Sequence, residues 1–325
     1  LTTGIILIPQ GIAYAIIAGL PPIYGLYTAL IPQLVYTLLG TSRQLAVGPA
    51  AMDSLIVASG ISVLAAVGSE HFIVLSVLLA FMVGFFQFIF GIFRMGFLVN
   101  FLSSPVISGF TSGSAIIIAM NQIGNLTGIN LDRNNQIHLL FKDLFSHLDS
   151  IHWPSFLIGS STIVVLLIMK FLIKKIPASL VVVVIGIAVT YFFDFEQFGI
   201  VILGEIPQGL PEFKLPAFDK NFIEQISGLA LTLALIGFME AISIAKSIEA
   251  KHNSYQVEPN KELIALGFGN MIGSFFQTFP ATGGFARSAI NDQAGAKTPL
   301  SSFFAAVVIA CVLLFLTPVF LYLPK

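Results

Sequence analysis

The segment QLAVGP at residues 44–49 interrupts an apolar stretch of the chain. Pro49 disfavours helical backbone at Gly48 and suits the first turn of a helix that follows it. A second segment, QTFPATGG at residues 277–284, precedes a run that would form a helix of about 16 Å if it continued to residue 295. That length is roughly half the hydrocarbon thickness of a membrane. Both segments therefore predict helices that begin halfway through a bilayer.

The composition supports a membrane location for these two breaks. Of the 325 residues, 56% are hydrophobic and 10% are charged, and the mean hydropathy is +0.95. A soluble domain carries about 25% charged residues, so this chain has too little polar surface to cover a water-exposed globule. The net charge of −1 argues against nucleic acid as a partner, and the single Cys311 excludes a disulfide scaffold. We expect a multi-pass integral protein of the cell membrane, in contact with the lipid bilayer.

Continuous apolar runs predict an all-α polytopic membrane protein with about eleven spans, since a spanning helix needs about 20 mostly apolar residues. The runs do not alternate, which argues against a barrel of strands. The candidate spans are residues 2–18, 23–40, 45–67, 71–93, 104–126, 154–173, 177–194, 223–248, 261–276, 278–295 and 299–322. Two polar stretches, 131–152 and 195–224, are expected outside the bilayer.

The two interrupted spans predict an internal repeat and a binding site. Each follows two uninterrupted spans, and if seven spans precede the eighth, the second copy is inverted. Non-helical backbone at membrane depth is tolerated only where it is buried in protein or lines a cavity. Two half helices would then meet near the midplane with unpaired N–H groups at their N-termini, which favour an anion. The alternative is that both breaks are simple kinks.

Asp53, Glu240 and Arg287 are ionisable residues in the interior of the predicted spans, away from the span ends. Each costs about 2.5–3.5 kcal/mol at a helix centre unless it is paired or hydrated, so each is a functional candidate. Arg287 is expected to attract an oxyanion, or to pair with Glu240 as a structural ion pair. Glu240 either exchanges protons or stays ionised beside Arg287. Asp53 favours the dipole of its helix, but beside an anion it would need a proton or a cation.

The first span carries a narrow polar stripe with Gln10 and Tyr14, which could donate hydrogen bonds to a ligand. Tyr14 is otherwise an ordinary packed aromatic residue. The sequence contains no HExxH motif, Cys/His cluster or Walker-type loop, so we expect no metal, no cofactor and no enzyme activity. An enzyme using Asp53 and Glu240 as an acid/base pair, or a sensor that transports nothing, are the alternatives from other functional classes.

The motif LPPIYGLYT at 20–28, followed by LGTSR at 39–43, resembles the signature of the sulfate permease (SulP) family of anion transporters. IPQGIAY at 8–14 is similar to the first span of that family, and the two breaks are similar to its third and tenth spans. The resemblance covers the whole chain. It implies an inverted seven-span repeat fold with a core domain and a gate domain.

The resemblance also implies domain boundaries. Residues 1–95 and 223–325 would belong to the core, and residues 96–222 to the gate. We expect the chain to be the interior of a longer protein that also contains the remaining gate spans and the family's cytoplasmic STAS domain. A homodimer is expected for that full-length protein.

The resemblance implies a substrate site between the two half helices and beside the first span. The expected substrate-binding residues, which include the glycine just before the second half helix, are Gln10, Tyr14, Ala50, Ala51, Gly284, Phe285, Ala286 and Arg287. Ala286 departs from several relatives that carry a serine there. Glu240 and Asp53 are the expected ion-coupling residues. Because Ile244 and Ala245 stand where a sodium-coupled branch has hydroxyl residues, the resemblance favours a proton.

Together these features predict a secondary active transporter of an inorganic oxyanion or small carboxylate, in the class of sulfate, bicarbonate or a dicarboxylate. The small anion would move with a proton by alternating access. The alternatives on the same fold are a passive anion channel or uniporter, and an anion exchanger.

Overall fold

A computed structural model describes residues 2–97, 137–172, 178–193, 199–200, 202–204, 206–252 and 255–323, together with part of the stretch 109–129. Most of the expected span 104–126 and residues 131–136 of the first polar stretch lie outside the described residues. Two compact units are present. One comprises residues 1–107 and 209–314, and the other comprises residues 108–208 and 315–325.

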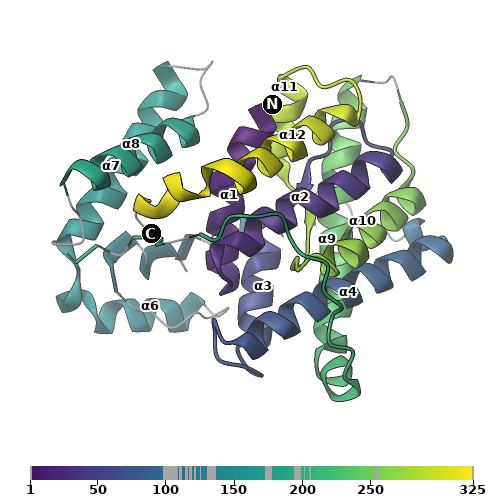
Figure 1. Ribbon diagram of the computed structural model, residues 1–325, viewed down its shortest axis with the longest axis horizontal. Helices are drawn as coiled ribbons and strands as arrows, with labels where there is room; N and C mark the ends of the chain where they lie inside the picture. The colour runs from purple at the N-terminus through teal and green to yellow at the C-terminus, as the bar shows by residue number, and fades with distance from the viewer. Residues whose placement is uncertain are drawn as a thin grey trace. The chain divides into compact units, whose positions relative to one another are not determined.

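The described residues of the first unit form helices and one short pair of strands (Figure 1). Its elements are α1 (Thr2–Ala18), α2 (Pro22–Leu39), β1 (Val47–Gly48), α3 (Ala51–Ile61), α4 (Glu70–Ile92), α9 (Lys220–His252), α10 (Pro259–Ser274), β2 (Thr282–Gly283), α11 (Phe285–Gln293) and α12 (Leu300–Cys311). Helix α12 continues into a π-helical stretch, η4 (Val312–Leu316). The second unit contains α6 (Ile137–Ser146), η2 (Leu148–Ser150), α7 (Trp153–Leu172), α8 (Ala178–Phe193) and η5 (Thr317–Tyr322).

Several helices of the described part are long and apolar enough to cross a membrane. Four qualify by length and composition, and they are Pro22–Leu39, Glu70–Ile92, Lys220–His252 and Leu300–Tyr322. Shorter apolar helices cover Thr2–Ala18, Ala51–Ile61, Trp153–Met169 and Val181–Phe192. The all-α, membrane-type fold that the sequence predicts is therefore confirmed.

Local sequence explains where these helices begin. Helices α2 and α10 start with Pro22 and Pro259, whose missing N–H groups would have no partner in a first turn. Helix α4 starts after Ser69, whose hydroxyl accepts a hydrogen bond from the backbone N–H of Phe72 at 3.2 Å. Helix α2 ends before Gly40, whose N–H still bonds to the Tyr36 carbonyl.

Glycines allow two pairs of helices in the first unit to approach closely. A methyl group on Gly84 of α4 would lie 2.6 Å from the carbonyl oxygen of Gly267 on α10. A methyl group on Gly11 of α1 would lie 3.1 Å from the carbonyl oxygen of Gly25 on α2. Small residues at such crossings let helix backbones pack directly against each other, which is the usual packing mode in membranes.

Two expected spans differ from the structure. The helix after the first break ends at Ile61, although the span was expected to continue to Val67. The Ser62 hydroxyl donates a hydrogen bond to the Ser59 carbonyl at 3.1 Å, and Gly68 has a φ of +79°. Turns therefore replace the helix after Ile61. In the last span, regular α-helix ends at Cys311, and η5 contains Pro318, which cannot donate a helical hydrogen bond.

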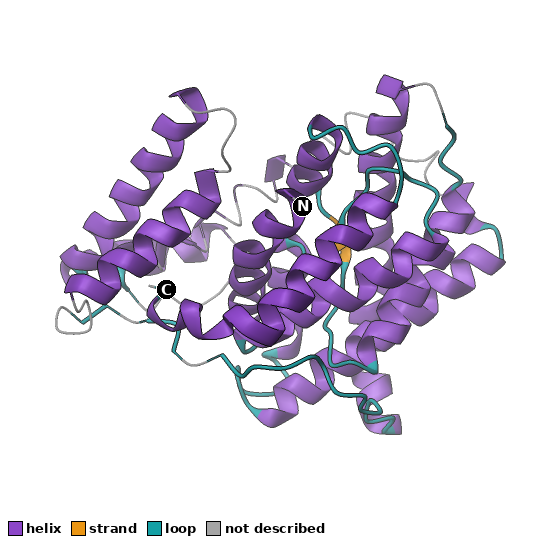
Figure 2. Ribbon diagram, turned by 45° about the horizontal axis from the view of Figure 1, so that its top comes forward, coloured by secondary structure: helices purple, strands orange, loops and turns teal. Residues whose placement is uncertain are grey.

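The two breaks pair with each other. Strands β1 and β2 are antiparallel, with Val47 opposite Gly283 and Gly48 opposite Thr282. Figure 2 shows the pair in orange, surrounded by helices of the first unit. All four residues are buried, so the pairing satisfies backbone groups that would otherwise have no hydrogen-bond partner. The pairing makes the start of α3 and the start of α11 neighbours in space.

Candidate functional site

The site is built on the N-termini of α3 and α11. The residues that cap them, Ala50 and Gly284, make no side-chain hydrogen bond to the first turn. Each helix therefore presents backbone N–H groups and the positive end of its dipole. The Gly284 N–H bonds to the Ala46 carbonyl at 3.0 Å, which fixes the second helix start against the first break. This arrangement favours a negatively charged ligand.

Arg287 lies in the first turn of α11 and is only 2% exposed. Its Nη1 donates a hydrogen bond to the carbonyl oxygen of Pro49, 2.7 Å away, directly before α3. Its Nε and Nη2 atoms are buried and have no hydrogen-bond partner among the described residues. A buried guanidinium with two unpaired nitrogens can donate two hydrogen bonds to an oxyanion.

The structure brings Glu240 near Arg287, and Asp53 near Glu240. Glu240 interacts electrostatically with Arg287 and with Asp53. Asp53 is 2% exposed and lies in the first turn of α3. Within the described part of the chain, Asp53 Oδ1 and Glu240 Oε2 are buried without a hydrogen-bond partner. The three intramembrane ionisable residues therefore form one cluster.

The remaining predicted site residues lie on α1 and at the two helix starts. Tyr14 interacts electrostatically with Arg287, and the Gln10 Oε1 atom is buried without a partner in the described residues. Ala50 is buried, whereas Phe285 is 65% exposed. Ala51 is partly buried and Ala286 is exposed. Their role in binding stays a prediction.

Several polar residues that the sequence did not single out hold the breaks in place. Asn270 of α10 accepts the Ala281 N–H at 2.8 Å and donates to the Ala281 carbonyl at 2.9 Å. Ser288 of α11 accepts the Ala46 N–H at 3.0 Å. Thr282 donates from Oγ1 to the Gly237 carbonyl of α9 at 2.6 Å. Each bond fixes backbone on either side of the strand pair, and a single sequence gives no signal for such distant partners.

Glu262 of α10 is a further buried carboxylate, which the sequence analysis did not single out. It is 0% exposed and accepts hydrogen bonds from Tyr36 Oη at 2.7 Å, Thr41 N at 2.7 Å and Oγ1 at 2.6 Å, and Ser42 N at 3.0 Å. Thr41 and Ser42 belong to the LGTSR motif, so this motif was the sequence signal that could have pointed to a buried acceptor. The carboxylate fixes the segment that leads from α2 into β1.

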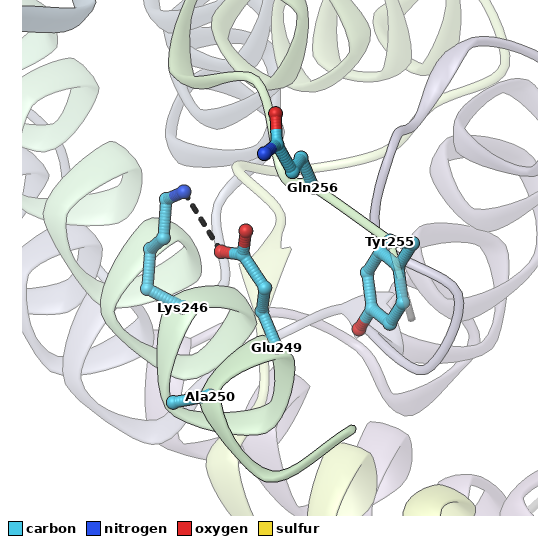
Figure 3. A pocket seen from close by; sticks show the side chains of 5 residues that line it. All are labelled: Lys246, Glu249, Ala250, Tyr255 and Gln256. Atoms are coloured by element: carbon cyan, nitrogen blue, oxygen red, sulfur yellow. Dashed lines mark ion pairs between the residues drawn. The ribbon is translucent and has the colours of Figure 1, made fainter. Parts of the chain in front are cut away.

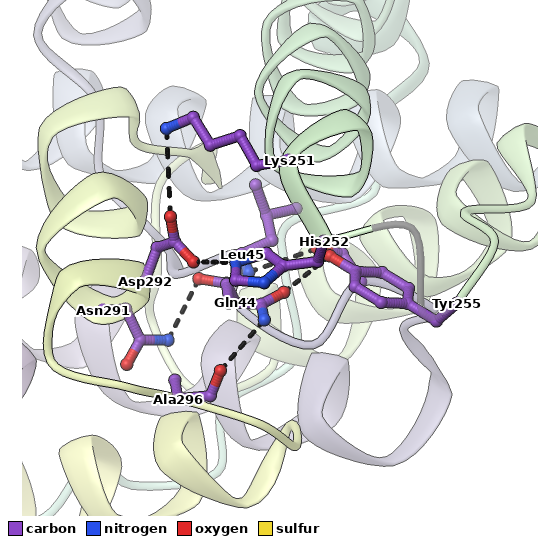
Figure 4. Close-up of polar contacts among 9 residues, drawn as sticks. Gln44, Leu45, Lys251, His252, Tyr255, Asn291, Asp292 and Ala296 are labelled. Atoms are coloured by element: carbon purple, nitrogen blue, oxygen red, sulfur yellow. Dashed lines mark hydrogen bonds and ion pairs between the residues drawn. The ribbon is translucent and has the colours of Figure 1, made fainter.

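The far end of α11 is tied to the end of α9 (Figure 4). Asp292 pairs with Lys251 at 3.8 Å and also with His252. Gln44 accepts a hydrogen bond from the Tyr255 hydroxyl at 2.5 Å. Burial raises the pKa of Tyr255, which keeps this hydroxyl in its donating form. These contacts orient α11 and leave its N-terminus directed towards α3.

A cavity of about 350 Å³ lies beside the end of α9 (Figure 3). It is lined by Lys246, Glu249, Ala250, Tyr255 and Gln256. Lys246 and Glu249 form an ion pair at 2.7 Å, and Glu249 also accepts the Val257 N–H at 3.2 Å. Since its charges are paired within the protein, this cavity offers no site comparable to that around Arg287.

The whole chain is similar to known proteins. A model of the sulfate permease family matches residues 1–325. Sulfate transporter 4.1, chloroplastic, of Arabidopsis thaliana is 42% identical over 100% of this chain and 48% of its own length. The sodium-independent sulfate anion transporter of Bos taurus is 35% identical over 100% of this chain and 58% of its own length. The chain thus spans about half the length of the curated relatives it matches.

Solved structures show the same fold. The murine Solute Carrier 26 family member A9 anion transporter, in an inward-facing state, has a TM-score of 0.91 at 26% identity, covering 99% of this chain and 56% of that one. The transmembrane domain of the cyanobacterium bicarbonate transporter BicA has a TM-score of 0.86 at 25% identity, covering 99% of this chain and 83% of that one.

Proposed function

Because the chain belongs to the sulfate permease family of membrane anion transporters, we propose that it is a secondary active transporter of an inorganic oxyanion or small carboxylate. The class includes sulfate, bicarbonate and dicarboxylates. The supporting observation is the buried Arg287, two of whose nitrogens have no hydrogen-bond partner in the described part of the chain and lie beside two helix N-termini. All of these groups are donors or positive dipole ends, so they complement the oxygens of an anion.

The proposed coupling ion is a proton held by Glu240. An ionised carboxylate beside Arg287 would repel an incoming anion, and uptake of a proton by Glu240 would remove that repulsion. The buried Oε2 atom, which has no donor among the described residues, supports such an exchange. The bovine relative is named a sodium-independent transporter, which also favours coupling without sodium here.

The wider architecture is part of the same proposal. We propose two inverted seven-span repeats, with a core formed by residues 1–95 and 223–325 and a gate that includes residues 96–222. Alternating access would move the core relative to the gate. The full-length protein is proposed to act as a homodimer in the cell membrane.

Uptake by the purified protein in proteoliposomes tests this function. With acid outside, the concentration of labelled sulfate inside the vesicles should rise above the external concentration. A protonophore should abolish this accumulation. Competition by unlabelled bicarbonate, succinate or chloride then identifies the preferred anion. Sulfate currents too large for alternating access would instead establish a channel, and uptake that needs an internal anion would establish an exchanger.

Replacing Glu240 with glutamine tests the coupling residue. Glutamine is similar in size but cannot exchange a proton, so sulfate uptake in Glu240→Gln should respond less to an imposed pH gradient. Equilibrium exchange of labelled for unlabelled sulfate should persist. The matched control is Glu249→Gln, which changes a carboxylate on the same helix that pairs with Lys246. Unchanged proton dependence in Glu240→Gln would refute the assigned role.

Replacing Gly284 with alanine should displace the guanidinium of Arg287. The added methyl group would lie 2.5 Å from Nη2 and 2.8 Å from Nε, closer than non-bonded atoms approach. We expect the apparent affinity for sulfate to fall about tenfold, a change of about 1.4 kcal/mol. Gly48→Ala is the matched control at the other break, since its methyl group would lie 3.6 Å from Arg287 Nη2. Equal affinities of the two variants would contradict the prediction.

A further inference from the structure

Asp53 lies against the same face of α9 that carries Glu240. A methyl group on Gly237 would lie 3.4 Å from Asp53 Oδ2, so the carboxylate approaches the α9 backbone one turn before Glu240. Residues three apart on a helix lie on the same face. The two carboxyl groups interact electrostatically, although they lie on α3 and α9.

The charges around this pair do not balance if both carboxyl groups are ionised. Among the described residues, the charged group that interacts with the pair is Arg287 from α11, which Tyr14 from α1 also contacts electrostatically. One cation therefore stands against two carboxylates. Asp53 is only 2% exposed, and its Oδ1 has no hydrogen-bond donor in the described residues. The Glu240 Oε2 atom is also buried without a hydrogen-bond donor among the described residues. A buried anionic oxygen without a donor is costly, and like charges that share a site favour uptake of a proton.

We propose that Asp53 and Glu240 form a two-carboxyl proton site, in which both groups are protonated while a divalent anion is bound. This inference rests on the proposed transport function. With sulfate bound, Arg287 and two neutral carboxyl groups leave one net negative charge in the site. With both groups ionised, three negative charges would share the same buried space. Two protons therefore enter with each divalent anion and return to water after its release, which makes transport electrically neutral.

Two protons per anion have a measurable consequence. Each proton that moves down a gradient of one pH unit supports about a tenfold accumulation of the anion, and two protons support about 100-fold. Electrically neutral uptake is also insensitive to a membrane potential. In Asp53→Asn only Glu240 exchanges a proton, so accumulation should fall to about tenfold per pH unit and should respond to voltage.

The test measures sulfate accumulation at equilibrium in proteoliposomes, across imposed pH gradients and potassium diffusion potentials. We expect about 100-fold accumulation per pH unit for the wild-type protein, about tenfold for Asp53→Asn, and restoration in Asp53→Glu. Ser54→Ala, which removes a neighbouring buried hydroxyl, serves as the matched control and should behave as wild type.

The outcomes separate this inference from the proposed function. Tenfold accumulation per pH unit in the wild-type protein would overturn the two-carboxyl site while leaving proton-coupled transport intact, even if Asp53→Asn does not fold. A wild-type slope that Asp53→Asn leaves unchanged would overturn the role of Asp53. No proton-driven accumulation of sulfate by the wild-type protein would overturn the proposed function together with this inference.

Discussion

Sulfate uptake by Arg287→Gln is expected to fall about 100-fold or more. The guanidinium is the positive group of the candidate site, and two of its nitrogens are buried without a partner among the described residues. Truncating one member of a buried, hydrogen-bonded charge pair costs about 2–5 kcal/mol, and each 1.4 kcal/mol is tenfold in affinity. The glutamine variant also leaves Glu240 near the site without its counter-charge, which opposes anion entry further.

The measurement compares initial rates of labelled sulfate uptake, normalised to the amount of monodisperse protein in the vesicles. Lys297→Gln removes an exposed positive charge shortly after α11 and should retain the wild-type rate. Arg287→Lys keeps the charge but loses the planar pair of donors, so an intermediate rate is expected. An uptake rate for Arg287→Gln within threefold of wild type would contradict the assignment of this arginine to the anion site.

Glu262→Ala is expected to cause the largest loss of stability, about 3–5 kcal/mol in the free energy of unfolding, because several donors lose their acceptor. The variant removes an acceptor that receives four hydrogen bonds, from Tyr36, Thr41 and Ser42. It leaves the Tyr36 hydroxyl and backbone N–H groups buried without partners, and each such group costs about 1–3 kcal/mol. The loss should appear as a lower midpoint in thermal unfolding of the detergent-solubilised protein, followed by size-exclusion chromatography.

The matched control is Glu258, which lies four residues before Glu262 and directly precedes α10. Glu258 pairs with Lys261 at 2.7 Å, and both side chains are more than half exposed. Exposed pairs contribute about 0–1 kcal/mol, so Glu258→Ala should shift the midpoint little. Equal shifts in the two variants would show that Glu262 does not anchor the segment after α2.

The sequence predicted the positions of the two breaks because proline and glycine act locally. Pro49 restricts the residue before it, and the helix after the second break begins at Phe285, as expected from the two glycines that precede it. The apolar runs predicted α7 and α8 to within a residue or two at each end. Membrane helices are this predictable because their length and polarity are set by the bilayer.

The pairing partners of the site could not be predicted in the same way. Glu262 and Asn270 are ordinary polar residues at the start and in the middle of an expected span, and nothing nearby in sequence indicates what they bind. The end of α3 at Ile61 was also missed, because residues 62–67 are mostly apolar and give no local stop signal. Contacts between distant segments decide such features, and a hydropathy pattern does not contain them.

The hydrogen bonds between β1 and β2 have a consequence for how the protein is made. Val47 and Gly283 stand in opposite halves of the chain, so a ribosome releases the first strand long before its partner exists. During that interval the peptide groups around Gly48 need water, a translocation pore or a chaperone to satisfy them, because lipid cannot. The region around α3 should therefore mature late in biogenesis. In nascent chains that stop before residue 283, it should remain accessible to protease, or to thiol reagents at a cysteine introduced there.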